Sequence, residues 1–191
     1  MPLASDDPVV RYLTARGIDM QRFPKFVRYV EHCRYKDEGH HPAMVAKFLA
    51  PDGKPVTLHK TYLTHFGTKA EVPEPKLLMP GDLAKGGSIR LTSPAATLGI
   101  AEGIETALSA AQLFSVPCWA SLNAGLLMAW QPPPEAKEVV IFADNDSNGV
   151  GQQAAWSLYA RLHRDGLKVR VEMPPDVDTD WNDALRGDPA A

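Results

Sequence analysis

The feature that most constrains the fold of this chain is an apolar run, EVVIFA (138–143), that ends in two aspartates one residue apart. Asp144 and Asp146 are followed at once by Gly149 and by a long helical pattern, GVGQQAAWSLYARLHRDG. Small or apolar residues recur in that pattern every four positions, which is the spacing of a helix that packs one face on a sheet. The stretch therefore predicts a buried strand, a tight acidic turn and a helix, in that order.

The same alternation fills the chain after about residue 96. Strands are expected at TLGIA, VPCWASL, EVVIFA and LKVRVEM, and helices at GIETALSAAQLF, AGLLMAW, GVGQQAAWSLYARLHRDG and DWNDALRG. Strands that alternate with helices form parallel sheets through right-handed crossovers, and near-continuous apolar strands suit a sheet covered on both faces. Residues 96–191 are thus expected to be an α/β domain, a parallel sheet flanked by helices.

Residues 1–95 predict a smaller N-terminal α+β appendage. DDPVVRYLTAR (6–16) predicts a helix with Pro8 early in it and Gly17 at its end. AMVAKFLAPDGKPVTLHKTYLT predicts a β-hairpin closed by the turn PDGK. KAEVPEPKLLMPGDLAKGGSIRL is rich in Pro and Gly, so it predicts a loop or short strands near the domain boundary.

Composition excludes several classes of protein. Apolar residues make up 45% of the chain, which is enough for a packed core. No apolar run is long enough to span a membrane, and the N-terminus lacks the pattern of a secretory signal. Cys33 and Cys118 are far apart, which predicts a reducing, cytoplasmic setting without disulfides. The sequence has no GxxxxGK[ST] loop of a helicase or ATPase and no four-ligand zinc ribbon.

Charge is unevenly divided between the two parts. Residues 1–95 hold 14 Lys and Arg against 10 Asp and Glu, whereas residues 96–191 hold 6 against 13. This asymmetry suits a polyanion-binding surface beside a metal site, although chance alone produces such a pattern about as often. Candidate contacts to nucleic acid, which an ordinary solvated face would equally explain, are Arg22, Lys25, Arg28, Arg34, Lys36, Lys60, Lys69, Lys76, Lys85 and Arg90, with Tyr29, Tyr35 and Tyr62 as stacking candidates.

Acidic residues follow three of the expected parallel strands. Ligands of open α/β sheets bind at the carboxyl ends of the strands, so these side chains are expected to meet at one edge. Clustered carboxylates repel one another, and a hard divalent cation, Mg²⁺ or Mn²⁺, relieves the repulsion. The sequence therefore predicts a metal site built from Glu102 after the first strand, Asp144 and Asp146 after the third, and Asp176, Asp178, Asp180 or Asp183 after the last.

Three segments carry a family resemblance. IAEGIETALSAA, IFADNDSNGVGQQAA and DTDWNDAL resemble, in this order, the motifs of the Toprim domain, the catalytic module of bacterial-type primases, topoisomerases and some nucleases. The sequences of these three motifs are most similar to those of primase-like Toprim proteins of plasmids, phages and integrated elements. Upstream, YLTARGI, HPAMVAKFLAPDG, HKTYLTHFGTKA, and KLLMPGD followed by GGSIRL resemble the region that precedes Toprim in those proteins, so the resemblance extends from about residue 9 to 186.

The resemblance implies roles for individual residues. Glu102 matches a catalytic acid/base or metal ligand, Asp144 and Asp146 match a catalytic metal-binding pair, and Asp180 best matches the third acidic position, with Asp178 and Asp183 as alternatives. The implied activity is metal-dependent nucleotidyl transfer, the synthesis of short primers on single-stranded DNA from nucleoside triphosphates. A helicase or another replication protein is expected as a further partner. A Toprim nuclease and a non-catalytic nucleic-acid-binding subunit stay open as alternatives.

Two further expectations concern the surroundings of the site. Glu105 is expected in the first turn of a helix, where the helix dipole favours a carboxylate, and not as a metal ligand. Trp119, Trp130 and Trp156 are expected in the core, and Trp181 is expected to pack beneath the acidic loop.

Overall fold

The structure is a computed structural model of the chain, and it describes residues 3–19, 27–81 and 83–187. Within these ranges the strands form one nine-stranded sheet in the order β4-β3-β2-β5-β7-β6-β8-β9, with β1 also paired to β2. The strands are β1 (Val27–Arg34), β2 (His40–Leu49), β3 (Pro55–Tyr62), β4 (Lys76–Leu78), β5 (Ser88–Ile89), β6 (Thr97–Ala101), β7 (Cys118–Ala120), β8 (Glu138–Phe142) and β9 (Lys168–Glu172). The helices are α1 (Pro8–Thr14), α2 (Ile104–Phe114), α3 (Ala124–Ala129), α4 (Val150–Arg164) and α5 (Trp181–Arg186).

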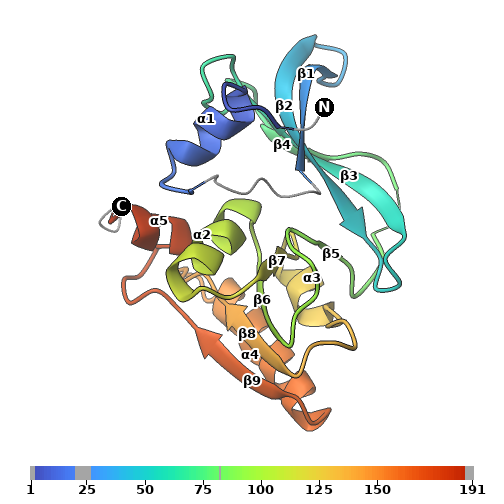
Figure 1. Ribbon diagram of the computed structural model, residues 1–191, viewed down its shortest axis with the longest axis vertical. Coiled ribbons are helices and arrows are strands. Elements are labelled where there is room, and N and C mark those ends of the chain that lie inside the picture. Colours follow the sequence, from blue (N-terminus) through green and yellow to red (C-terminus); the bar gives the residue numbers. More distant parts are fainter. Residues whose placement is uncertain (1–2, 20–26, 82, 188–191) are drawn as a thin grey trace.

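The second half of the chain is the α/β arrangement expected from its alternating pattern. Strands β7, β6, β8 and β9 are parallel neighbours. Val139 and Ile141 of β8 pack toward α3 and α4, whereas Val140 and Phe142 pack toward α2 and α5. Both faces of this sheet are therefore covered, as Figure 1 shows, and this explains why its strands are apolar at nearly every position.

The first half is an antiparallel sheet with one helix against it. The expected hairpin is formed by β2 and β3, and the amide of Ala50 closes its turn on the carbonyl of Lys54 at 2.9 Å. Helix α1 covers one face of this sheet, where Leu13 joins the same apolar cluster as Met44 of β2. The segment rich in Pro and Gly contributes only the short strands β4 and β5.

Strand β5 connects the two halves. It pairs with β2 on one side and with β7 on the other, both antiparallel, so the sheet runs through both halves without a break. Residue 95, where the sequence predicts a domain boundary, lies between β5 and β6. The largest apolar cluster also contains residues from both halves, including Val9 and Phe48 from the first and Ala107 and Phe142 from the second.

The tryptophans follow the expectation with one exception. Trp119 and Trp130 are buried edge to face, and Trp181, the residue that follows Asp180, is buried edge to face with Phe142. The prediction for Trp156 is wrong, because this side chain is 53% exposed on α4, two positions away from the packing residue Ala154. Both cysteines are buried and unpaired. Among the described residues, no helix has the length and apolar character that crossing a membrane requires.

Candidate active site

A pocket of about 320 Å³ opens at the carboxyl ends of β6 and β8, where the first half of the chain faces the second. Carboxylates and cations both line it. The acids all come from the second half, and three of the four cations come from the first. The acids are Glu102, Glu105, Asp144, Asp180 and Asp183, and the cations are Arg16, Lys69, Lys76 and Arg186.

Glu102 and Asp146 come together beside Gly151, the second residue of α4. A Cβ atom on Gly151 would lie 3.6 Å from Oε1 of Glu102, 3.5 Å from Oδ2 of Asp146 and 3.2 Å from the carbonyl oxygen of Asp144. Glycine at this position lets α4 begin directly against the carboxylates. Gly149, the glycine that follows the acidic pair in the sequence, has a φ of +71° and serves the turn, but a Cβ there would have no neighbour within 4 Å among the described residues.

The carboxylates repel one another, as predicted. Burial, followed by the charges of Asp180, Glu102 and other acids, raises the pKa of Asp144 to about 8. Burial and the Asp146 carboxylate raise the pKa of Glu102, and burial raises that of Asp180. Oδ1 of Asp144 is buried and has no hydrogen-bond donor among the described residues. A bound cation would therefore stabilise the acidic side of the pocket by relieving the repulsion among its carboxylates.

These residues fit a hard cation, although they do not form a complete site by themselves. Among the described residues, no three Asp, Glu, His or Cys side chains are arranged to hold a metal ion. The donors present are carboxylate oxygens, and the unpartnered Oδ1 of Asp144 is open to a further ligand. Mg²⁺ commonly takes one or two carboxylates and completes its shell with water and phosphate oxygens. Asp144, with Glu102, Asp146 or Asp180, would hold it here.

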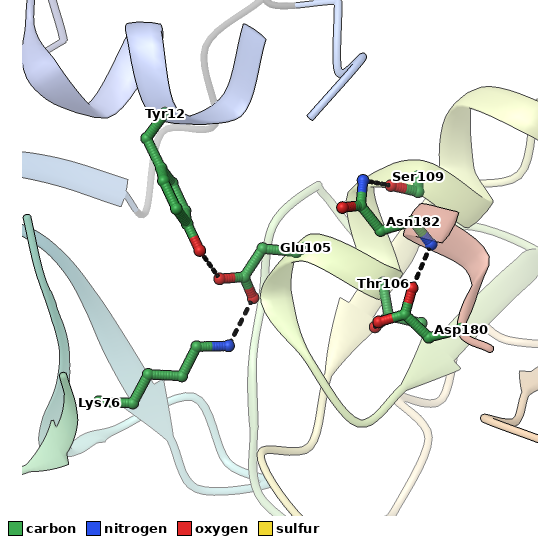
Figure 2. A network of polar contacts seen from close by, with 7 residues as sticks. All are labelled: Tyr12, Lys76, Glu105, Thr106, Ser109, Asp180 and Asn182. Atoms are coloured by element: carbon green, nitrogen blue, oxygen red, sulfur yellow. Dashed lines mark hydrogen bonds and ion pairs between the residues drawn. The ribbon is translucent and has the colours of Figure 1, made fainter. Parts of the chain in front are cut away.

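Asp180, the residue expected at the third acidic position, lines the pocket. Its Oδ1 caps α5 by accepting from the amides of Asn182 at 2.6 Å and Asp183 at 3.0 Å, and its Oδ2 accepts from the Thr106 hydroxyl at 3.3 Å. Figure 2 shows this carboxylate held between α5 and α2. The sequence segment DWND thus forms a capping box that fixes an acid at the pocket.

Asp178, the other candidate at this position, lies outside the pocket. It is exposed, its backbone has a φ of +61°, and its carboxylate accepts from the amide of Ser147 at 2.8 Å. Asn145 makes a second connection between the same two loops, because its amide group donates to the carbonyls of Pro174 and Asp176 at 3.0 Å each. Asp178 and Asn145 therefore hold the two acidic loops together, and Asp180 lines the pocket whereas Asp178 does not.

The basic residues proposed from the sequence are divided between two faces of the sheet. Residues paired across antiparallel strands share a face, so Arg28, opposite Val45, lies on the same face as Lys60, which Val45 also opposes. Lys76 is opposite Thr61, the neighbour of Lys60, and so lies on the other face, toward the pocket. Of the members of this set that the structure describes, Lys69 and Lys76 line the pocket and the others do not.

The remaining members of that set have other surroundings. Arg90 donates to the carbonyls of Ala50 and Pro51 and lies over the Trp119 ring, so it connects parts of the fold. Arg34 and Lys36 pair with surface acids, and Lys85 is exposed. Arg22 and Lys25 lie outside the described residues. The stacking prediction is wrong for three side chains that are buried, Tyr29, Tyr35 and Tyr62.

Three residues in or beside the pocket were not found from the sequence, namely Tyr12, Arg16 and Arg186, and Glu105 does more than its pattern predicts. Glu105 occupies the expected first turn of α2 but is buried and bonded to Tyr12 and Lys76. The position of Glu105 three residues after Glu102 was the one sequence feature that could have indicated its location beside the pocket. Tyr12 and Arg16 lie in or just after an ordinary amphipathic helix, so their pattern contained no such signal.

Comparisons with known proteins concern the family and the fold of the chain. The family model of the Toprim domain matches residues 97–190, and a domain family of unknown function matches residues 1–91. No curated protein matches the chain. The Escherichia coli primase catalytic core is similar in structure, with a TM-score of 0.62 and 17% identity over 94% of this chain and 69% of that one.

Two other solved structures show the same fold. The DnaG primase catalytic domain bound to single-stranded DNA has a TM-score of 0.57 and 17% identity, over 95% of this chain and 70% of that one. The primase fragment of the bacteriophage T7 primase-helicase has a TM-score of 0.58 and 15% identity, over 93% of this chain and 65% of that one. At these identities the likeness concerns the fold, and it extends through both halves of the chain.

Proposed function

Because residues 97–190 are a Toprim domain within a primase-like fold, we propose that this chain is a metal-dependent nucleotidyltransferase that synthesises short primers on single-stranded DNA. The observation that carries the proposal is the pocket itself. Its acids, Glu102, Asp144 and Asp180, face the cations of the first half across a space of about 320 Å³. A nucleoside triphosphate with a divalent metal requires both kinds of charge in one place.

Each side of the pocket has a separate task in this proposal. The side chains of Arg16, Lys69, Lys76 and Arg186 bind phosphate oxygens of the incoming nucleotide and the departing pyrophosphate. Asp144, with Glu102, Asp146 or Asp180, would hold Mg²⁺ or Mn²⁺, and the bound metal would stabilise the charge that develops on the phosphate oxygens. Glu102, whose pKa is raised, is suited to accept the proton of the 3′-hydroxyl that attacks the α-phosphate.

The partners follow from the same reasoning. The template is single-stranded DNA, which a structurally similar DnaG domain binds. A helicase or another replication protein is the natural further partner, since the similar T7 fragment comes from a primase-helicase protein. The sequence resemblance to Toprim proteins of plasmids and phages supports service to a mobile genetic element.

The test is an incorporation assay with single-stranded DNA, labelled NTPs or dNTPs, and Mg²⁺ or Mn²⁺. Wild type is expected to make short labelled products, and Asp144→Asn is expected to make none, because the buried ligand at the metal would be lost. Shortened template without products would support a nuclease instead. Binding of DNA without either activity, unchanged by Asp144→Asn, would support a non-catalytic subunit.

A further inference from the structure

Glu105 is a buried carboxylate at the edge of the pocket with two partners from distant parts of the chain. Its Oε1 accepts from the Tyr12 hydroxyl of α1 at 2.6 Å, and its Oε2 accepts from the Lys76 ammonium of β4 at 3.0 Å. Figure 2 shows the three side chains converging from three elements. Burial alone would raise the pKa of Glu105, but the Lys76 charge and the Tyr12 hydroxyl outweigh it and lower the pKa to about 2. Glu105 is therefore ionised at neutral pH.

Tyr12, which binds Glu105, also contacts a second cation, Arg16. The guanidinium of Arg16 lies 4.3 Å from the centre of the Tyr12 ring, so Arg16 stacks on the residue that binds Glu105. Lys76 and Arg16 both line the pocket. An ammonium group has three donors, so Lys76 can bind Glu105 and still present N–H groups to a phosphate.

Helix α2 also holds the acidic side of the pocket. Thr106 donates to Asp180, and the Asn182 amide group donates to the Ser109 hydroxyl at 3.0 Å and to the Arg16 carbonyl at 2.9 Å. The helix begins immediately after Glu102 and Gly103. The polar residues in the first turns of α2 thus connect the cations of the first half to the acids of the second.

We propose that Glu105 and Tyr12 are positioning residues that hold Lys76 and Arg16 on the phosphate-binding side of the pocket. The inference rests on the proposed function, since it assumes that phosphates enter there. Glu105 is not a ligand in this role, and its carboxylate acts through Lys76. Loss of its charge would release Lys76 without removing a cation, so the pocket would keep its attraction for phosphate but lose the orientation of one donor.

The first experiment measures the position of Lys76 without any catalysis. The protein is treated with an amine-acylating reagent, and the rate at each lysine is followed by mass spectrometry with exposed Lys85 as internal reference. Glu105→Gln and Tyr12→Phe are expected to raise the Lys76 rate relative to Lys85, by about tenfold for Glu105→Gln, because a charge-assisted bond is lost. Tyr35→Phe, which removes a buried hydroxyl that accepts from the amide of Glu74 and does not bind Glu105, is the control. An unchanged Lys76 rate in Glu105→Gln would overturn the proposal.

The second experiment separates positioning from folding. In the incorporation assay, Glu105→Gln is expected to lower kcat by about tenfold to a hundredfold while KM for the nucleotide rises little, whereas Lys76→Met is expected to raise KM. A destabilised but otherwise normal protein would show the wild-type KM and a kcat that recovers at lower temperature. Wild-type KM and kcat in Glu105→Gln would overturn the proposal.

A third measurement separates the failure of this inference from that of the proposed function. Tripolyphosphate with Mg²⁺ is expected to protect Lys76 and Lys69 from acylation in wild type. If wild type incorporates no nucleotide but shows this protection, and Glu105→Gln weakens it, the positioning role stands and the proposed activity fails. If Lys76 is not protected, the assignment of this side of the pocket to phosphate is wrong.

Discussion

The hydroxyl of Tyr12 donates a 2.6 Å hydrogen bond to Oε1 of Glu105, which lies 93 positions further along the chain. The bond joins α1 of the first half to α2 of the second, at the edge of the pocket. The pocket therefore exists only when the two halves are packed together. Substitutions of Tyr12 or Glu105 should therefore affect both the stability of the contact between α1 and α2 and the activity of the pocket.

Tyr12→Phe is expected to destabilise the protein by about 1.5–3 kcal/mol, the usual contribution of a hydrogen bond to a buried charged group. Tyr35→Phe is the matched control, because its buried hydroxyl accepts from the amide of Glu74 at 3.3 Å and interacts with the exposed Lys36. It is expected to cost about 1 kcal/mol or less. Urea unfolding of both variants measures the difference, and equal losses would contradict a special role for the Glu105 hydrogen bond.

Stability at acid pH should depend on Glu105. The pKa of Glu105 is about 2 in the folded protein and is close to 4.5 in an unfolded chain, so the unfolded state takes up the proton first. Its contribution to stability is complete above pH 4.5 and is lost as the pH falls to about 2. Glu105→Gln is therefore expected to be less stable than wild type at pH 7 and to lose less stability between pH 4.5 and 3. If the urea midpoints of Glu105→Gln and wild type changed with pH in the same way, Glu105 would not be the source of the acid dependence.

Asp144 should have the opposite effect on the metal-free protein. Its pKa is about 8 when folded, against 3.8 ordinarily, so the folded state holds the proton more tightly. The contribution of Asp144 to stability is complete below pH 3.8 and is lost as the pH rises to 8. Without metal, Asp144→Asn is expected to be more stable than wild type at pH 8.

Added Mg²⁺ provides a second test of Asp144, because the metal competes with the proton for the Asp144 carboxylate. The thermal midpoint of wild type is expected to rise with Mg²⁺ more at pH 8 than at pH 6, whereas that of Asp144→Asn should barely respond at either pH. Glu105→Gln, which leaves the metal-binding acids intact, should still respond. An equal response of Asp144→Asn and wild type would show that the metal binds elsewhere.

Gly151→Ala should lower activity far more than stability. Alanine is the better helix residue by about 0.5–1 kcal/mol, but here its methyl group would lie within 3.6 Å of both Glu102 and Asp146 carboxylate oxygens. We expect incorporation to fall at least about tenfold with little loss of stability. Gly125→Ala in α3, where the only described neighbour of the new methyl is the Asn123 side chain at 3.4 Å, is the control. Full activity in Gly151→Ala would mean that the carboxylates need no such close approach.

The two faces of the first sheet should bind different ligands. Lys69→Ala, within the pocket, is expected to raise KM for the nucleotide. Arg28→Ala and Lys60→Ala, on the opposite face, are expected to weaken binding of single-stranded DNA and to reduce its salt slope by about 0.7 for each phosphate that the variant no longer neutralises. Titrations at several salt concentrations measure the slope. If neither Arg28 nor Lys60 changes it, that face is only solvated.

Local sequence patterns were enough to predict the fold of the second half of the chain and most of the acidic residues that line the pocket. Its strands are apolar at nearly every position because both faces of a parallel sheet are covered, and its long helix α4 carries an apolar row every four residues. The carboxylates follow strand ends because that is where a parallel sheet opens to ligands. These patterns assign Glu102, Asp144 and Asp180 to one edge of the sheet, and the three residues line one pocket in the structure.

The side chains of the first half that complete the pocket could be identified only once the chain was folded. The face on which Lys60 or Lys76 lies depends on strand register, and a shift of one residue exchanges the two faces. Tyr12 and Arg16 belong to a short helical segment whose sequence shows only that one side is apolar, so their approach to Glu105 depends on how α1 packs against α2. Long-range packing brings these residues together, and no local pattern in the sequence encodes the distance between them.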